Sequence, residues 1–145
     1  MSSDSESNLR AAEGHSAGGL LVPLKLENYY TIVPVHVDRE GPYRFLLDTG
    51  ALRCIVSPDV AQSLRLPKGE PCKARGSVDS IDAYRSCVSR LSVGSVCCED
   101  LQVTVMDCTH VSGYVHDRVD GYIGTNFLEH FVMTLNYRDQ TLTLQ

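Results

Sequence analysis

The chain has 145 residues, a formal net charge of −5 and an apolar fraction of 43%. This length fits one domain with its own hydrophobic core, because domains most often contain about 100–150 residues. The net negative charge without a basic block argues against nucleic-acid binding, and no apolar run approaches the roughly 20 residues that span a bilayer.

Residues 1–19 differ from the rest of the chain in composition. They are rich in Ser, Gly, Ala and Glu and show little hydrophobic periodicity. We expect a disordered tail at 1–19 and a folded domain at 20–145. The tail has no apolar stretch of the kind found in secretory signals, so a cytoplasmic or similarly reducing location is expected.

The first part of the domain shows short β-type runs separated by turns. Strands are predicted at residues 20–26, 31–37, 43–47 and 55–56. Pro23 and Pro34 favour edge positions, because proline cannot donate a backbone hydrogen bond. A turn at 38–42 joins the second and third strands into a hairpin that ends at Asp48.

The apolar run Phe45–Leu47 leads into Asp48, which is followed by Thr49, Gly50 and Ala51. The run predicts a buried strand, which would place the Asp48 carboxylate inside the protein. A lone buried carboxylate is unfavourable, because burial disfavours the charged form. Asp48 is therefore expected to have a partner or a function.

A short helix is predicted after the Asp48 stretch. Ser57 is a good N-cap residue, and Pro58 suits the first helical position. Val60 and Leu64 are four residues apart, so they give a helix that runs through Leu64 one apolar face.

Residues 72–86 are more polar and are predicted to form the two arms and the tip of a hairpin. The tip residues are Ser77, Val78, Asp79, Ser80 and Ile81. This hairpin either projects over a cleft or is an ordinary surface hairpin, and the segment taken alone favours the second interpretation.

The second half of the domain continues the β pattern. Strands are predicted at residues 87–93, 101–106, 131–137 and 141–144, with a loop at 107–119. The stretch from Val119 to Leu128 predicts a buried strand cut off by glycine, after which Thr125 caps a short helix at 126–130. Eight or nine short strands, one or two short helices and no strand–helix alternation predict a mostly β barrel.

The six cysteines allow three interpretations, and their even number alone could indicate disulfides. Reduced cysteines that pack as small, partly apolar side chains are favoured in a reducing compartment. A zinc site would draw its ligands from Cys97, Cys98, Cys108, His110 and His116. These residues lack the paired CxxC spacing of structural zinc sites, so no metal or other cofactor is expected.

Two separated stretches resemble parts of the retropepsin-like aspartic proteases. Leu46-Leu47-Asp48-Thr49-Gly50-Ala51 is similar to the catalytic turn of that family. The stretch Asp120–Leu128 is similar to its hydrophobic-hydrophobic-glycine element and the helix that follows. The resemblance covers residues 31–144 and looks closest to the single-domain, cellular branch. It implies a retropepsin-like closed β-barrel with a flap hairpin.

The resemblance implies an aspartic endopeptidase that acts on a peptide or protein substrate. Members of the family activate water between two carboxylates that share a proton, and this chain has a single Asp-Thr-Gly. Asp48 would therefore meet the Asp48 of a second copy in a symmetric homodimer, while Asp120 would lie in a structural strand. The implied supporting residues are Thr49, Gly50, Ala51, Tyr122, Ile123 and Gly124, with the flap residues 77–81 covering the substrate.

The chain departs from the family pattern at three positions. Leu52 and Arg53 stand where viral members usually have two acidic residues that contact the substrate. Thr125 stands where an arginine often pairs with one of those acids, so no buried charge is left unpaired by the changes. An inactive or very slow peptide-binding or dimerisation module with the same fold is the alternative to an enzyme.

Overall fold

The structure is a computed structural model that describes residues 20–73, 82–111 and 113–145. The elements of the first half are β1 (Leu20–Pro23), β2 (Lys25–Glu27), β3 (Tyr30–Val37), β4 (Glu40–Leu47), β5 (Cys54–Val56), α1 (Pro58–Ser63) and β6 (Pro71–Lys73). Those of the second half are β7 (Asp82–Val93), β8 (Val96–Val105), the 3₁₀ turn η1 (Thr109–Val111), β9 (Gly121–Ile123), α2 (Thr125–Leu128), β10 (Met133–Asn136) and β11 (Thr141–Leu144).

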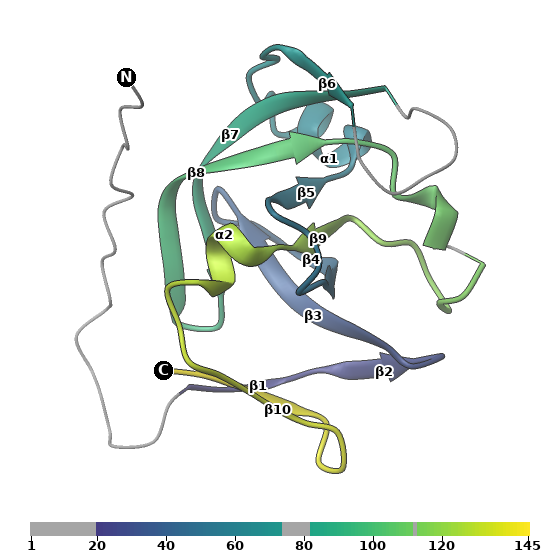
Figure 1. Ribbon diagram of the computed structural model, residues 1–145, viewed down its shortest axis with the longest axis vertical. Helices are drawn as coiled ribbons and strands as arrows, with labels where there is room; N and C mark the ends of the chain where they lie inside the picture. The colour runs from purple at the N-terminus through teal and green to yellow at the C-terminus, as the bar shows by residue number, and fades with distance from the viewer. Residues whose placement is uncertain (1–19, 74–81, 112) are drawn as a thin grey trace.

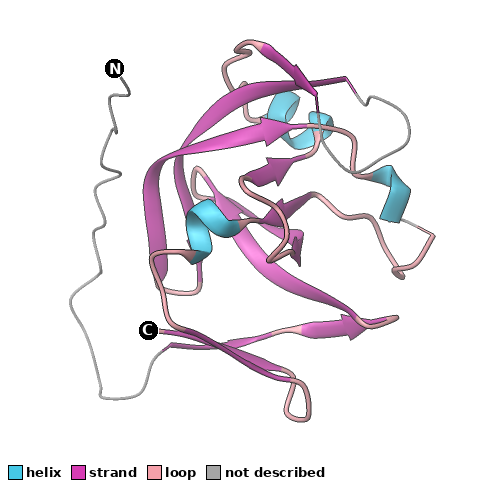
Figure 2. Ribbon diagram, viewed as in Figure 1, coloured by secondary structure: helices cyan, strands magenta, loops and turns pink. Residues whose placement is uncertain are grey.

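Six strands close into a barrel, which confirms the prediction of a mostly β barrel with two short helices (Figures 1 and 2). The order is β3, β4, β9, β5, β8 and β7, and β7 pairs back onto β3. Strands β2 and β6 extend the sheet beyond the barrel, and β1, β11 and β10 form a separate antiparallel sheet. None of the helices in the described part is long and apolar enough to cross a bilayer.

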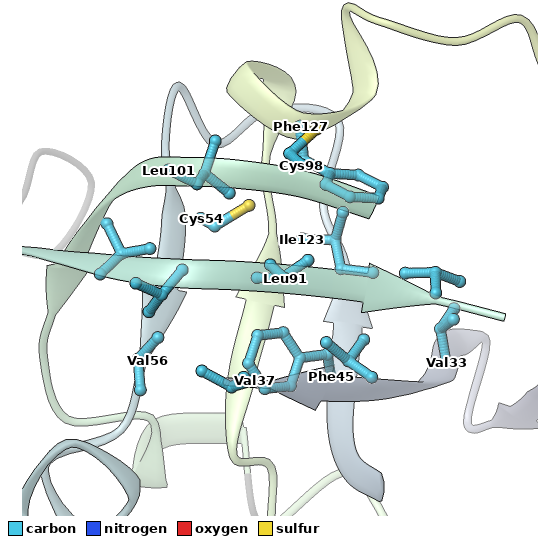
Figure 3. Close-up of a cluster of buried hydrophobic side chains, with 14 of the residues drawn as sticks. Val33, Val37, Phe45, Cys54, Val56, Leu91, Cys98, Leu101, Ile123 and Phe127 are labelled. Atoms are coloured by element: carbon cyan, nitrogen blue, oxygen red, sulfur yellow. The ribbon is translucent and has the colours of Figure 1, made fainter. Parts of the chain in front are cut away.

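The barrel interior holds the main hydrophobic core, because alternate residues of each strand face inward. Figure 3 shows side chains from several strands and from α2 converging there. Phe45, Leu91, Ile123 and Phe127 are among the largest fully buried side chains. Burying each such side chain contributes about 1.5–3 kcal/mol, so this core fixes the strands that carry the Asp48 stretch.

The predicted edge position is confirmed for Pro23 and wrong for Pro34. Strand β1, which contains Pro23, is an edge of the three-stranded sheet. Strand β3 is interior, yet β2 pairs only as far as Ile32 and β7 pairs only from His36. Pro34 lies in the gap between these two partners, so its missing N–H removes no ladder hydrogen bond on that side.

The first predicted helix is confirmed, and the second differs at its start. In α1 the Ser57 side chain caps the helix by accepting a hydrogen bond from the Val60 N–H at 3.3 Å. In α2 the N-cap is Gly124, which has no side chain for capping, and Thr125 is the first helical residue. The Thr125 hydroxyl instead donates to the Thr49 carbonyl at 3.4 Å, so it ties the helix to the Asp48 stretch.

Several of the remaining strands are longer or more divided than predicted, β10 is shorter, and the described part contains eleven strands. The stretch 20–26 splits into β1 and β2, which pair with different strands. The two arms of the 72–86 hairpin exist as β6 and the start of β7, with Cys72 paired to Ala83. Its tip residues 77–81, like the tail 1–19, lie outside the described residues.

Candidate active site

Asp48 lies at the end of β4, where that strand runs parallel to β9. Leu47 is the register partner of Ile123, and the Asp48 N–H continues the ladder by donating to the Ile123 carbonyl at 3.0 Å. The carboxylate is half-buried, and Thr49 and Gly50 are exposed. The expectation of an interior Asp48 is therefore wrong for the single chain, because the strand reaches the protein surface where it ends.

Short-range hydrogen bonds shape the Asp48 loop. The Asp48 Oδ1 accepts the Gly50 N–H at 2.9 Å, and the Ala51 N–H donates to the Asp48 carbonyl at 3.2 Å. A Cβ at Gly50 would stand 3.3 Å from Oδ1, and Gly50 does not adopt a positive φ. Gly50 therefore serves here by letting its backbone approach the carboxylate closely.

The end of β9 and the start of α2 clamp this loop from below. The Thr125 N–H donates to the Ala51 carbonyl at 2.8 Å, and the Asn126 N–H donates to the Leu52 carbonyl at 3.2 Å. A Cβ at Gly124 would lie 2.5 Å from the Arg53 backbone, so only glycine permits this approach without a shift. The structure thus brings the two motif stretches into direct contact.

Two further residues fix the clamp, and the sequence assigned no role to either. The Asn126 side chain accepts the Cys54 N–H at 2.8 Å and donates to the Gln102 carbonyl at 2.7 Å. The buried Cys54 sulfur accepts the Gly124 N–H at 3.3 Å, and burial raises the pKa of this thiol to about 11. An amide beside a glycine-ended strand is a usable signal, because Asn can satisfy a donor and an acceptor together.

Tyr122 lies on the opposite face of β9 from the barrel core. Its hydroxyl and the His110 Nε2 are 2.9 Å apart and share a hydrogen bond. Burial raises the pKa of Tyr122, and the Cys108 thiol and the Asp48 carboxylate add to that effect. Tyr122 is only 5% exposed, so burial is the main cause of its raised pKa and the Asp48 carboxylate a smaller one.

The departures Leu52 and Arg53 follow directly on the loop. Leu52 is 83% exposed, and Arg53 is half-buried. Within the described ranges, the ion pairs found involve neither Arg53 nor Asp48. The Asp48 carboxylate thus has the Gly50 N–H as its hydrogen-bond partner and no cationic one in this part of the chain.

Asp120 lies in a different environment at the start of β9. Its Oδ2 accepts the Arg44 N–H at 2.9 Å, and its Oδ1 pairs with the Arg118 Nε at 2.9 Å. The Arg44 guanidinium also pairs with Glu27, which accepts the His116 N–H at 2.9 Å. Asp120 therefore belongs to a structural network.

In the described part of the chain, the cysteines and histidines do not gather into a metal site. Over residues 20–73, 82–111 and 113–145, no group of three or more His, Cys, Asp or Glu side chains is placed to hold a metal ion. No disulfide joins the six cysteines, all of which lie in the described ranges, and Cys54, Cys97, Cys98 and Cys108 are buried.

An Asp-Thr-Gly loop supported by a glycine-ended strand inside a closed barrel defines an aspartic-protease type of site. Residues 33–127 match the aspartyl protease family, and the chain belongs to that family. A comparison with curated protein sequences found no match.

Solved structures show the same fold at low sequence identity. A retropepsin-like aspartic protease from Rickettsia conorii has a TM-score of 0.59 and 16% identity, over 88% of this chain and 89% of that one. The retroviral protease-like domain of Ddi1 from Leishmania major has a TM-score of 0.53 and 15% identity, over 90% of each chain. The fold is therefore retropepsin-like, as the resemblance implied.

Proposed function

We propose that this protein is an aspartic endopeptidase that hydrolyses peptide bonds with Asp48 as its catalytic carboxylate. The observation that carries the proposal is the geometry of Asp48. Its carboxylate is held by a loop that is hydrogen-bonded at five backbone positions, Asp48, Thr49, Gly50, Ala51 and Leu52, and it lacks a neutralising cation in the described part of the chain. A fixed, partly exposed carboxylate of this kind is suited to general acid–base chemistry.

The second carboxylate comes from a second copy of the chain. Asp120 is unsuited for two reasons. It lies beside Arg44, which precedes Asp48 by four residues of strand, or about 13 Å. Its carboxylate is also already bonded to the Arg44 N–H and the Arg118 guanidinium. The symmetric solution is a homodimer in which two Asp48 side chains meet at the axis. Thr49 and Gly50, exposed in the single chain, would then face the partner subunit or the substrate.

The reaction follows from two carboxylates that share one proton. Two close carboxylates do not ionise together, so one acts as base toward a water molecule and the other as acid toward the substrate. The ionised Asp48 takes a proton as the water attacks the peptide carbonyl. The protonated Asp48 of the other copy gives its proton to the carbonyl oxygen as the tetrahedral intermediate forms. The first Asp48 then passes the proton it took from water to the amine nitrogen. The C–N bond breaks as one hydroxyl of the intermediate returns its proton to the other carboxylate.

The remaining predicted residues have supporting roles in this proposal. Ala51 and Gly124 keep the loop in place, and Tyr122 and Ile123 form its base. The hairpin of β6 and β7 would cover the peptide with its tip, residues 77–81, as catalytic lids do. A cytoplasmic location, with reduced thiols, fits the same proposal.

A peptide-binding or dimerisation module with little activity is the second candidate. The observation that favours it is the exposed Leu52 beside Arg53 in place of an acidic pair that contacts the substrate. The clamp around Asp48 weighs against it, because a scaffold gains nothing from orienting an unpaired carboxylate.

The test is the conversion of Asp48 to Asn. Purified protein is assayed for cleavage of itself and of denatured casein at mildly acidic pH, with and without a statine-type inhibitor. Cleavage by the wild type should fall at least about a thousandfold in Asp48→Asn, equivalent to about 4 kcal/mol of transition-state stabilisation. Inhibitor-sensitive activity that survives in Asp48→Asn would contradict the mechanism, and a wild type without activity would favour the binding module.

A further inference from the structure

A second, smaller hydrophobic cluster lies on the outer face of the strands that carry Asp48. Leu46 of β4, Tyr122 of β9 and Ile55 of β5 are register partners in one row across the three strands. Their sequence neighbours face the barrel core, so by alternation these three point away from it. Leu46 and Tyr122 are only 7% and 5% exposed, so something covers this outer row.

The cover comes from the connection between β8 and β9, residues 107–111 and 113–119. Its buried apolar side chains are Cys108, Val111, Val115 and Val119, and all four belong to the same cluster as the row. Figure 1 shows this connection, with η1, extending beyond the barrel before it returns to β9. The outer row is thus covered by the chain itself.

Asp48 faces the same side as the covered row. It follows Leu46 by two residues in an extended stretch whose ladder continues through the Asp48 N–H, so both side chains point to one face. The contribution of the Asp48 carboxylate to the raised pKa of Tyr122 agrees with this placement. A substrate that reaches the Asp48 carboxylate therefore passes beside the residues that cover Tyr122.

The cover is attached differently at its two ends. Near β9, the Arg118 carbonyl accepts the Arg44 Nε–H at 3.1 Å, the Arg118 guanidinium pairs with Asp120, and the His116 N–H binds Glu27. Near β8, the side-chain hydrogen bond that joins the cover to the row is the one between His110 and Tyr122.

We propose that His110 and Val111 restrict the substrate of the proposed protease to small side chains next to the scissile bond. Val111 occupies apolar surface that a larger substrate side chain would need. His110 is a positioning residue, because it holds Val111 in place through the Tyr122 hydroxyl. This inference rests on the proposed function for its substrate, whereas the attachment by His110 stands on the fold alone.

The first experiment measures the attachment without any need for activity. The full chain is treated with iodoacetamide, and the alkylation rate of each cysteine is followed by mass spectrometry. His110→Ala should speed alkylation of Cys108 severalfold, because Cys108 belongs to the cover and is only 2% exposed, and should leave the core residue Cys54 unchanged. His116→Ala is the matched control, because this segment uses the backbone N–H of His116, and it should change neither rate.

An unchanged Cys108 rate in His110→Ala would overturn the role of His110. Equal acceleration at Cys108 and Cys54 would also overturn it, because it would report general unfolding and not release of the cover.

The second experiment measures specificity with two peptides that differ only in having Ala or Phe on both sides of the cleaved bond. The wild type should prefer the Ala peptide in kcat/KM, and Val111→Ala should improve the Phe peptide about tenfold relative to the Ala peptide. A wild type that cleaves the Phe peptide as well as the Ala peptide would overturn the inference. A wild type that cleaves neither peptide refutes the proposed function and the specificity with it, and the alkylation result still decides the attachment.

Discussion

Asp48 and Asp120 occupy opposite ends of the contact between β4 and β9, and their surroundings differ. Asp120 is 5% exposed and has two strong partners, the Arg44 N–H and the Arg118 guanidinium. Asp48 is half-buried and accepts one hydrogen bond, from the Gly50 N–H within its own loop. The first carboxylate is satisfied within the chain and stabilises the fold, whereas the second is oriented but left available.

This difference separates a structural aspartate from a catalytic candidate on physical grounds. A buried carboxylate stabilises a fold only when its charge is compensated by hydrogen bonds or a cation. The backbone around Asp48 is well bonded although its carboxylate is not, so the structure maintains the position of the carboxylate without neutralising it. Substitutions at the two ends should therefore affect different properties.

The largest difference in stability is expected between Asp120 and Asp48. Asp120→Ala removes the carboxylate that accepts from the Arg44 N–H and the Arg118 guanidinium. It should lower the free energy of unfolding by about 2–3 kcal/mol, since hydrogen bonds to charged groups contribute about that much. Asp48→Asn should change it by less than about 0.5 kcal/mol, as surface substitutions do. Urea denaturation of the wild type and both variants measures these changes in the free energy of unfolding.

Asp139→Ala is the matched control for that prediction. It removes an exposed ion pair with Arg138 and should cost less than about 1 kcal/mol. Equal losses in Asp120→Ala and Asp48→Asn would erase the distinction between the two aspartates.

The next effect concerns the clamp at the Asp48 end. Gly124→Ala would place a methyl group 2.5 Å from the Arg53 backbone, so the loop or the helix must shift. We expect a loss of about 1–3 kcal/mol in unfolding free energy, typical of overpacking, together with reduced cleavage. Gly113→Ala, where a Cβ meets nothing within 4 Å, is the control and should be near neutral. If Gly124→Ala were as stable as the wild type, the contact between residue 124 and the Arg53 backbone would have room for a methyl group, which would contradict the close approach.

The smallest effect concerns pH at the Asp120 end. Burial alone would raise the pKa of Glu27, but hydrogen bonds from Arg44 and the His116 N–H outweigh it and hold the pKa below its usual value. A lowered folded pKa means that this stabilisation is present above the usual glutamate pKa, about 4.3, and is lost as pH falls through the folded value.

Glu27→Gln should therefore be less stable than the wild type at neutral pH, and the difference should shrink in acid. Free energies of unfolding of both proteins, measured from neutral to acidic pH, test the sign of this pH dependence. A difference that grows on acidification would contradict the proposed charge of Glu27.

The sequence predicted the elements whose signals are local. Ser57 and Pro58 marked the start of α1, and the alternating strands and the Asp-Thr-Gly run marked the barrel and its loop. The contact between the loop and the Gly124 region came from resemblance to a family. Local pattern could not have supplied it, because the two stretches meet only in the folded chain.

Contacts between distant residues escaped prediction for the same reason. Glu27 and Arg44 lie in β2 and β4, two strands that do not pair with each other. Nothing in the sequence around either residue indicates that their side chains form an ion pair. Thr125 was expected to cap a helix, but its hydroxyl reaches the Thr49 carbonyl, so a tertiary contact replaced a local one. His110 was considered in the sequence only as a candidate zinc ligand, whereas the fold brings it to the Tyr122 hydroxyl.

The central claim is that a working site needs Asp48 from two copies of the chain, and subunit mixing tests it most directly. Wild-type protein is equilibrated with an about tenfold excess of Asp48→Asn, and cleavage is measured with substrate in large excess. If two copies share the site, nearly all wild-type chains are paired with the variant and activity should fall to roughly a tenth. Activity that stays at the level of the wild type alone would show that one chain carries a complete site, and would contradict the account.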